Sequence, residues 1–179
     1  MILKDAKRPV VFTIGHSTRP LEEFIGILKA HGVARVADVR TVPRSRHNPQ
    51  YNRESLPGNL QAAGLGYVHL PGLGGLRHPK AASPNRGWRN ASFRGFADYM
   101  QTPEFAEALQ KLMELAEKAP IGLMCAEAVP WRCHRSLIAD ALTVRDFQVE
   151  HLLGPGGSQP HRLTAFARVA GATVTYPPK

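Results

Sequence analysis

The tripeptide Cys133-His134-Arg135 has the residue types that point most directly to chemistry. The surrounding pattern predicts the start of a helix, where free N–H groups and the positive end of the helix dipole favour anions. A thiol in that position, beside basic side chains, has a lowered pKa and reacts as a thiolate. We therefore predict Cys133 as a nucleophile, His134 as its catalytic neighbour and Arg135 as a ligand for an anion. The alternative for Cys133 is a small side chain that packs the start of the helix.

Cys125 and Arg132 resemble the loop of cysteine phosphatases, in which a thiolate at a strand end and an arginine bracket a phosphate. The spacing differs from that loop by one residue, and Pro130 and Trp131 replace the small residues whose amides would hold phosphate. We therefore favour a structural role for Cys125 in a buried strand. Cysteine-phosphatase chemistry is the alternative.

His16 and Glu127 are the predicted acid–base residues. His16 follows Gly15 at the end of an apolar run, and the pKa of a free imidazole lies near neutrality. Glu127 follows another apolar run, where the loss of water is expected to raise the pKa of a carboxyl group. Ser17 is expected to donate its hydroxyl to a phosphate or a ribose. The alternative for His16 is a structural hydrogen bond between strand ends.

The charge of the chain is concentrated in two stretches. Its 179 residues include 23 basic and 14 acidic ones, a formal net charge of +9. Nine basic residues lie in the two stretches: Arg40, Arg44, Arg46 and Arg53, and then Arg77, Lys80, Arg86, Arg89 and Arg94. We expect basic loops at about residues 43–58 and 71–95, with Arg40, Arg46, Arg77 and Arg94 binding an anion. Solvated basic loops without a ligand are the alternative.

Asp38 lies just before this first basic stretch, at the end of a predicted strand. It is a candidate binding residue that either orients His16 or pairs with Arg40 or Arg46. A catalytic carboxylate and a structural ion pair are both consistent with its position.

Alternating strand and helix patterns must position these residues. The sequence predicts strands near residues 10–14, 33–39, 66–70, 121–125 and 149–153, an edge strand at 173–176, and helices near 21–28, 103–116, 134–142 and 163–169. Such alternation favours one α/β domain over residues 1–179, with a mainly parallel sheet between two helical layers. Ligands of such sheets bind at the carboxyl ends of the strands, where the predicted site residues fall.

The chain contains an ordered set of motifs: Thr13-Ile14-Gly15-His16-Ser17, Asp38-Val39-Arg40, Pro43-x-Ser45-Arg46, and Leu123-Met124-Cys125-x-Glu127 followed by Cys133-His134-Arg135. Through these motifs it resembles a bacterial and archaeal family of domains of unknown function, numbered four-eight-eight. The resemblance extends from about residue 13 to residue 161. It implies an α/β fold and leaves the activity to be argued from the residues.

Composition excludes several classes of protein. The chain is 43% hydrophobic and 21% charged, has no apolar run near the roughly 20 residues that span a bilayer, and shows no signal-peptide pattern at residues 1–9. Its two cysteines cannot form a disulfide framework. We therefore expect a cytoplasmic protein with free thiols and no membrane partner, and exclude secreted, membrane and fibrous proteins.

We favour an enzyme that acts on an anionic, phosphate-bearing substrate, a nucleotide or nucleic acid, in a cleft at the carboxyl ends of the strands. The alternatives are a non-catalytic nucleic-acid-binding domain and a protein that binds a small anion or metabolite. No metal-ligand spacing or nucleotide-binding glycine motif is present, so we predict no metal site and no cofactor. The sequence fixes neither the reaction type nor the oligomeric state.

Overall fold

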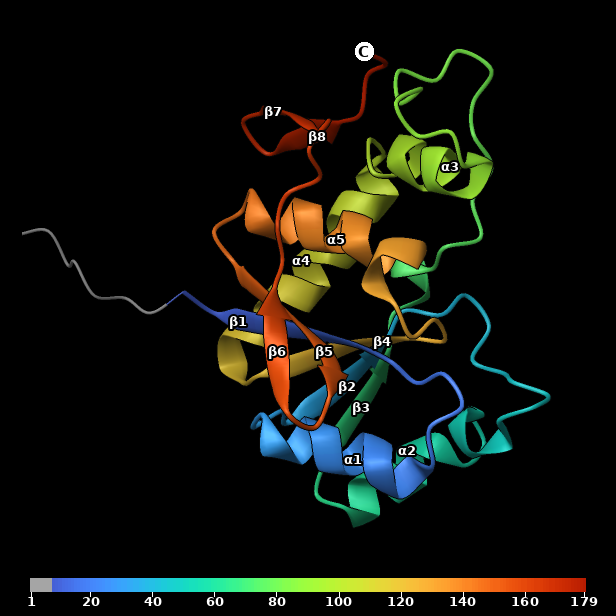
Figure 1. Ribbon diagram of the computed structural model, residues 1–179, viewed down its shortest axis with the longest axis vertical. Coiled ribbons are helices and arrows are strands. Elements are labelled where there is room, and N and C mark those ends of the chain that lie inside the picture. The colour runs from blue at the N-terminus through green and yellow to red at the C-terminus, as the bar shows by residue number, and fades with distance from the viewer. Residues whose placement is uncertain (1–7) are drawn as a thin grey trace, which may run out of the picture.

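A six-stranded sheet forms the centre of the protein (Figure 1). The computed structural model describes residues 8–179; part of the stretch without a signal-peptide pattern lies outside them. The strands lie side by side in the order β3 (Gly66–His69), β2 (Arg35–Asp38), β4 (Ile121–Cys125), β1 (Val10–Gly15), β5 (Gln148–Gly154) and β6 (Gly157–Pro160). All pairs are parallel except β5 and β6, which form an antiparallel hairpin. The predicted α/β fold is confirmed.

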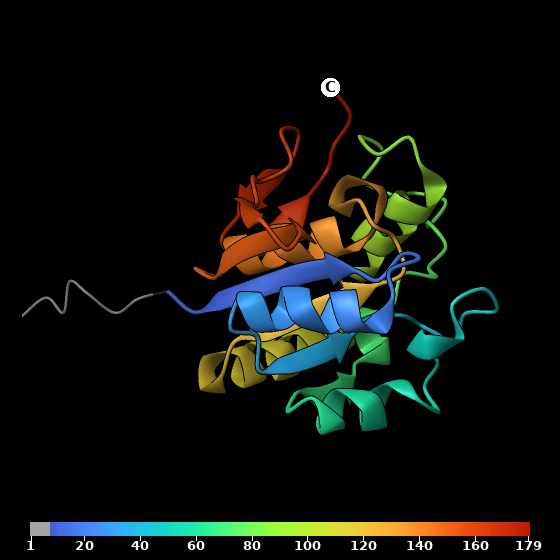
Figure 2. The same cartoon turned by 60° about the horizontal axis from the view of Figure 1, so that its bottom comes forward.

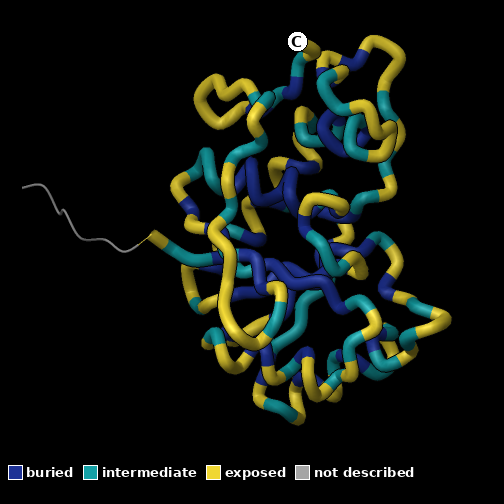
Figure 3. The backbone as a smooth tube through the Cα atoms, viewed as in Figure 1, coloured by how far each residue is buried: buried dark blue, intermediate teal, exposed yellow. Residues whose placement is uncertain are grey.

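Helices cover both faces of the sheet (Figures 1 and 2). On one face, α1 (Leu21–Ala30) and α2 (Leu56–Ala62) bury Phe24 and Leu60 against Ile14 and Met124 of the strands. On the other face, α3 (Ala91–Tyr99), α4 (Pro103–Lys118) and α5 (Arg135–Thr143) pack with the second half of the core. Buried backbone accordingly follows the central strands in Figure 3.

The chain leaves the two central strands in opposite directions. From β1 it passes through α1 to β2 on one face, and from β4 through α5 to β5 on the other. The loops that follow β1 and β4 therefore diverge at the carboxyl edge of the sheet, which is where open α/β sheets bind ligands. Gly15 allows these loops to touch, because a Cβ there would overlap the carbonyl group of Glu127.

Several predicted elements differ in the structure. The predicted helix at 163–169 is wrong: this segment leads into β7 (Arg168–Ala170), which pairs with β8 (Thr173–Thr175) in a separate two-stranded sheet. Three short 3-10 turns, η1 (Pro49–Tyr51), η2 (Pro71–Leu73) and η3 (Pro130–Arg132), lie in the loops. The side chain of Thr102 caps α4 by accepting from the backbone N–H of Phe105, whereas α1 begins after Pro20 without a side-chain cap.

The second basic loop is fixed by a buried carboxylate. Asp98 of α3 accepts hydrogen bonds from the backbone of Lys80 and from the side chains of Ser83 and Asn85. Asn85 in turn accepts from the backbone N–H of Tyr176, near the chain end. The loop is therefore part of the folded body beside β8.

No helix within residues 8–179 combines the length and apolar character needed to cross a membrane.

Candidate functional site

Arg135, the first residue of α5, is fully buried at the carboxyl end of β4. Its Nη1 donates to the sulfur of Cys125 (3.0 Å) and to the carbonyl oxygen of Glu127 (2.9 Å), and its Nη2 donates to the carbonyl oxygen of Ala128 (3.0 Å). Within residues 8–179 no carboxylate forms an ion pair with it, and its Nε has no hydrogen-bond partner. A guanidinium keeps its charge when buried, so its burial requires a nearby anion. Among the contacts of the guanidinium within residues 8–179, only the sulfur of Cys125 can become that anion.

Cys125 and Cys133 form a close pair of free thiols, with 2.8 Å between their sulfurs. Burial alone would raise the pKa of Cys125, but the hydrogen bond from Cys133 and the charge of Arg135 lower it to about 7. The pKa of Cys133 is raised well above its ordinary value, because its S–H donates to Cys125 and because the group is buried. These contacts favour Cys125 over Cys133 as the thiolate, and the expected role of Cys133 stays a prediction. Arg135 directs its guanidinium at Cys125 and gives Cys133 only a backbone N–H, 3.5 Å away.

His134 lies beside this pair as a neutral imidazole. Its Nε2 is 3.2 Å from the carbonyl oxygen of Val39, and its Nδ1 is 3.5 Å from the sulfur of Cys133. The carbonyl can only accept, so we assign the ring proton to Nε2, which leaves Nδ1 as an acceptor that faces Cys133. Burial lowers the pKa of His134 to about 4. Gly75 packs so closely on the ring that a Cβ at this position would clash with it.

Arg40 and Asp38 form a fully satisfied buried ion pair at the end of β2. Arg40 donates through Nε (2.9 Å) and Nη2 (2.7 Å) to the two carboxylate oxygens of Asp38, and through Nη2 to the carbonyl oxygen of Tyr51 (2.7 Å). The hydroxyl of Tyr67 donates to the same carboxylate (2.6 Å). Burial and this hydrogen bond raise the pKa of Tyr67. This geometry fits the structural alternative for Asp38.

The ring of His16 faces the opposite helical layer from Cys125. It stacks on Tyr51, whose core cluster includes Phe24 of α1, whereas Cys125 belongs to the cluster of α4 and α5. The His16 Nδ1 donates to the carbonyl oxygen of Ser17 (2.8 Å). Burial, more than the opposing hydrogen bond, lowers the pKa of His16. Its Nε2 lies 3.5 Å from Arg40. The His16 side chain thus reaches the site through Arg40, and its backbone N–H donates to the carbonyl oxygen of Cys125 (2.9 Å).

A pocket of about 370 Å³ opens over the cysteine pair. We name it the thiol pocket. Its polar lining consists of Arg40, Thr41, Arg44, Ser92, Cys125, Glu127, Arg132, Cys133 and His134. Arg44 and Arg132 are exposed and form no ion pair or side-chain hydrogen bond within residues 8–179. The pocket therefore combines a thiol of lowered pKa with two cations that have no partner within residues 8–179, an arrangement suited to an anionic molecule that reacts with sulfur.

Comparison with known families agrees with this architecture. The family described as Domain of unknown function DUF488 matches residues 20–142. The chain belongs to this family. The search of curated proteins and the search of solved structures each gave no match. The DUF488 match is shorter than the resemblance from 13 to 161, since it omits β1 with His16 and β5. It includes Cys125, Cys133 and Arg135.

The predicted site residues of this DUF488 protein fall into three groups: those that line the thiol pocket, those buried behind it and those outside it. Arg40, Glu127, Cys133 and His134 line the thiol pocket, and Asp38 and Arg135 lie buried behind it. The Glu127 side chain is exposed, not buried as expected, because the loop after β4 turns outward while its carbonyl oxygen faces Arg135. Ser17, with a φ of 46°, makes the turn after β1 and does not line the pocket.

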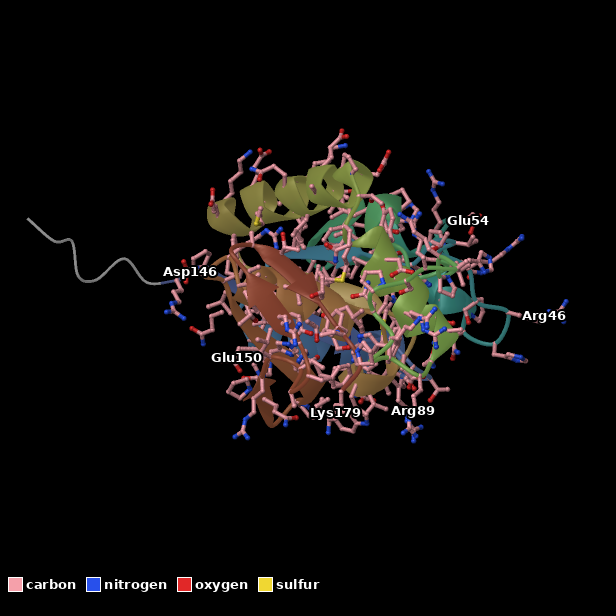
Figure 4. The ribbon with its side chains drawn as sticks, turned by 90° about the horizontal axis from the view of Figure 1, so that it is seen from above. Arg46, Glu54, Arg89, Asp146, Glu150 and Lys179 are labelled. Carbon is pink, nitrogen blue, oxygen red and sulfur yellow. The ribbon has the colours of Figure 1, made fainter. Side chains whose placement is uncertain are left out.

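The remaining predicted arginines lie outside the thiol pocket. Arg77 sits 3.6 Å above the ring of Tyr99 and donates to the carbonyl oxygen of Gly74. Arg94 donates to the carbonyl oxygens of Trp88 and Arg89. The contacts of Arg77 and Arg94 stabilise the structure of the second basic loop. Arg46 extends into solvent from the outer edge of the first basic loop (Figure 4).

Sequence reasoning missed the role of Cys125 and assigned no site role to Arg44. Cys125 ends a fully buried strand, a position that favours a core residue, and its activating arginine lies ten residues further along the chain. A thiol at the carboxyl end of a central strand was the available signal. No group of three or more histidine, cysteine, aspartate or glutamate side chains within residues 8–179 could hold a metal ion.

Proposed function

We propose that this DUF488 protein is an enzyme whose nucleophile is the thiolate of Cys125 and whose substrate is an anionic, phosphate-bearing molecule bound in the thiol pocket. The observation that carries the proposal is the buried Arg135: within residues 8–179, Cys125 is the one contact of its guanidinium that can take a negative charge. A structural cysteine needs no such cation. Thiolates activated by a neighbouring cation are characteristic of covalent catalysis.

The proposed reaction is group transfer through a covalent intermediate on Cys125. The sulfur forms a bond to the electrophilic centre of the substrate, and the leaving group departs with the electrons of its bond and takes a proton from water. Glu127, on the same pocket, then accepts a proton from the water molecule that releases the intermediate. Arg44 and Arg132 hold the substrate phosphate.

The arrangement around Cys125 argues against the cysteine-phosphatase alternative. In that chemistry, backbone amides surround a phosphate at the thiolate. Here the carbonyl oxygens of Glu127 and Ala128 face the arginine, and Arg135 is fully buried. We therefore assign the phosphate of the substrate to Arg44 and Arg132 as a binding group.

We also propose the cytoplasm as the location, because a reducing compartment keeps both cysteines as free thiols.

Alkylation with a neutral and an anionic reagent tests the proposal without knowledge of the substrate. Iodoacetamide should modify Cys125 with an apparent pKa of about 7, identified by peptide mass spectrometry. Cys125→Ser should abolish this fast reaction, whereas Cys133→Ser should retain it. Iodoacetate should react faster than the intrinsic reactivity of the two reagents predicts, because Arg44 and Arg132 attract its carboxylate.

The double variant Arg44→Ala/Arg132→Ala is the matched test of the anion site. It should remove the advantage of iodoacetate and leave the rate with iodoacetamide unchanged. Modification of Cys133 in place of Cys125, or an apparent pKa near 9 for Cys125, would contradict the proposed nucleophile. An unchanged iodoacetate rate in the double variant would contradict the proposed anion site.

A further inference from the structure

A second pocket, of about 330 Å³, lies on the other side of the η3 turn. Trp131 lines this second pocket, and the next residue, Arg132, lines the thiol pocket. A single turn of chain thus separates an aromatic wall from a cationic one. We name the second pocket the indole pocket, because both tryptophans of the chain line it.

The two tryptophans that line the indole pocket differ in exposure and in packing. Trp131 is 61% exposed, an unusual state for so large an apolar ring on a loop that the fold otherwise buries at Pro130. Trp88 is fixed by edge-on contacts with Phe93 and Phe166 at 5.0 and 4.8 Å between ring centroids. Its Nε1–H is buried and has no acceptor within residues 8–179. A buried donor without a partner is costly, so an acceptor on a bound molecule would stabilise it.

The floor of the indole pocket is a rigid, mutually hydrogen-bonded row of side chains. Asp140 accepts from His161 (2.7 Å), His161 is paired with His151 (2.8 Å), and His151 is paired with Thr13 (2.6 Å). Chiefly through burial, the pKa of His151 is lowered to about 3, so this ring is neutral at ordinary pH. All four side chains already have hydrogen-bond partners in this row. They therefore leave no unpaired charged group for a ligand.

The remaining polar groups near the indole pocket indicate that its ligand carries a negative charge. Arg162 is exposed and forms no side-chain hydrogen bond or ion pair within residues 8–179. Arg162 lines the indole pocket together with Trp131, and Arg132, the next residue along the chain, lines the thiol pocket, so each of the two pockets beside η3 has a cation. A flat ring system with acceptor atoms and a phosphate next to it matches this arrangement, because aromatic side chains stack on bases while arginines bind the backbone phosphate.

We infer that the indole pocket binds a nucleobase, stacked on Trp131, of a nucleotide whose phosphate reaches Arg132 in the thiol pocket. This deepens the proposed function, on which it rests for the role of Arg132, by naming the substrate class as a nucleotide. A free nucleoside monophosphate and a nucleotide within a single strand share this chemistry, and the two sources are separated below.

Tryptophan fluorescence tests this inference directly, since the chain has two tryptophans and both line the pocket. The intact protein and its Trp88→Phe variant, which emits only from Trp131, are titrated with AMP, adenosine, ribose 5-phosphate and a single-stranded oligoadenylate. AMP and the oligonucleotide should quench the emission, and ribose 5-phosphate should not. Trp131→Ala should weaken AMP binding roughly tenfold, measured by calorimetry, and Trp131→Phe should lose less because it keeps a ring.

Matched variants and a protection assay complete the test. Arg162→Ala should weaken binding severalfold, whereas Arg53→Ala, which removes the same charge from an exposed site elsewhere, should not. AMP should also slow the alkylation of Cys125 by iodoacetamide. Tighter binding of the oligonucleotide than of AMP would identify a single strand as the source, and the reverse would identify the free nucleotide.

Three results would overturn the inference: equal binding of AMP and ribose 5-phosphate, full affinity in Trp131→Ala, or quenching without protection of Cys125. Failure of the proposed function gives a different signature. In that case Cys125 shows an apparent pKa near 9 in the alkylation assay, whereas base-dependent quenching of Trp131 persists.

Discussion

Two buried arginines lie at the carboxyl ends of the neighbouring strands β2 and β4, and their charges are balanced by different groups. Arg40 meets a carboxylate, Asp38, through two donor atoms, and Tyr67 completes the hydrogen bonding of that carboxylate. Arg135 meets only a sulfur and two carbonyl oxygens, and its Nε is left without a partner. The first arginine is paired with a carboxylate through two hydrogen bonds. The second depends on a thiol that must lose a proton.

This difference indicates a structural role for the ion pair at β2 and a chemical role for the arginine and thiol at β4, on the same edge of the sheet. A satisfied ion pair holds Arg40 and the end of β2 in place, and it has no capacity left for a reaction. In the proposed function, the incompletely satisfied cation at β4 stabilises a thiolate, which is a reactive group. The four predictions below test this division, from the largest expected effect to the smallest.

Loss of the carboxylate at β2 should destabilise the whole fold. Asp38→Asn leaves the Arg40 charge buried without an anion, which should lower the free energy of unfolding by about 3–5 kcal/mol. Chemical denaturation measures this change. The double variant Asp38→Asn/Arg40→Met should recover part of the loss, since no buried charge is then left unpaired. A loss in Asp38→Asn below about 1 kcal/mol would show that the pair does not hold the scaffold.

Loss of the cation at β4 should act mainly on reactivity. Without Arg135 the pKa of Cys125 should rise from about 7 toward its ordinary 9.0. The thiolate fraction at pH 7 then falls roughly 50-fold in Arg135→Met, and the rate of alkylation by iodoacetamide falls with it. Arg135→Lys should retain part of the rate, and circular dichroism checks that both variants fold. An unchanged rate would mean that Arg135 does not activate the sulfur.

The same thiol should make stability depend on pH in the neutral to alkaline range. Its folded pKa of about 7 lies below its ordinary 9.0, so the unfolded chain binds more protons between these values. The stability contributed by Cys125 is therefore complete above pH 9 and is lost as the pH falls through 7, by at most about 1.4 kcal/mol per unit. Denaturation of the natural protein and of Cys125→Ser across this range should show the rise only in the former. Asp38→Asn should keep the rise, since it leaves Cys125 and Arg135 intact.

Removal of an arginine that belongs to neither arrangement should have the smallest effect. Arg46 extends into solvent, so Arg46→Ala should change the free energy of unfolding by less than about 0.5 kcal/mol. The rate of iodoacetate alkylation should also stay within about twofold of the natural protein. A large decrease in that rate would extend the anion site along the first basic loop and weaken the distinction between Arg44 and Arg46.

The sheet and its carboxyl edge were predictable because their signals are local. Apolar runs of strand length, separated by amphipathic helices, specify a parallel sheet, and parallel strands bring their carboxyl ends to one edge. The helix expected at 163–169 shows the limit of such signals. His161 and Thr164 bond to Asp140 of α5, and that tertiary attachment leads the chain into the β7–β8 hairpin.

The identity of the activated cysteine was not predictable from local pattern. The basic neighbours of Cys133 in the sequence suggested a thiolate there, because a helix start and adjacent charges lower the pKa of a thiol. In the folded chain, Arg135 turns its guanidinium back to the end of β4, and Cys133 becomes a donor to Cys125. These contacts favour Cys125, and not Cys133 as expected, as the sulfur with the lowered pKa.

Residue type and order alone determined the α/β class, the edge of the sheet that carries the polar groups, and the presence of thiol, imidazole and guanidinium side chains near one another. Tertiary structure alone decided which groups touch, and so which of them is charged. The physical reason is distance: hydrophobic periodicity acts over a few neighbouring residues, whereas the ionisation of a buried thiol depends on atoms within a few ångströms that come from different elements.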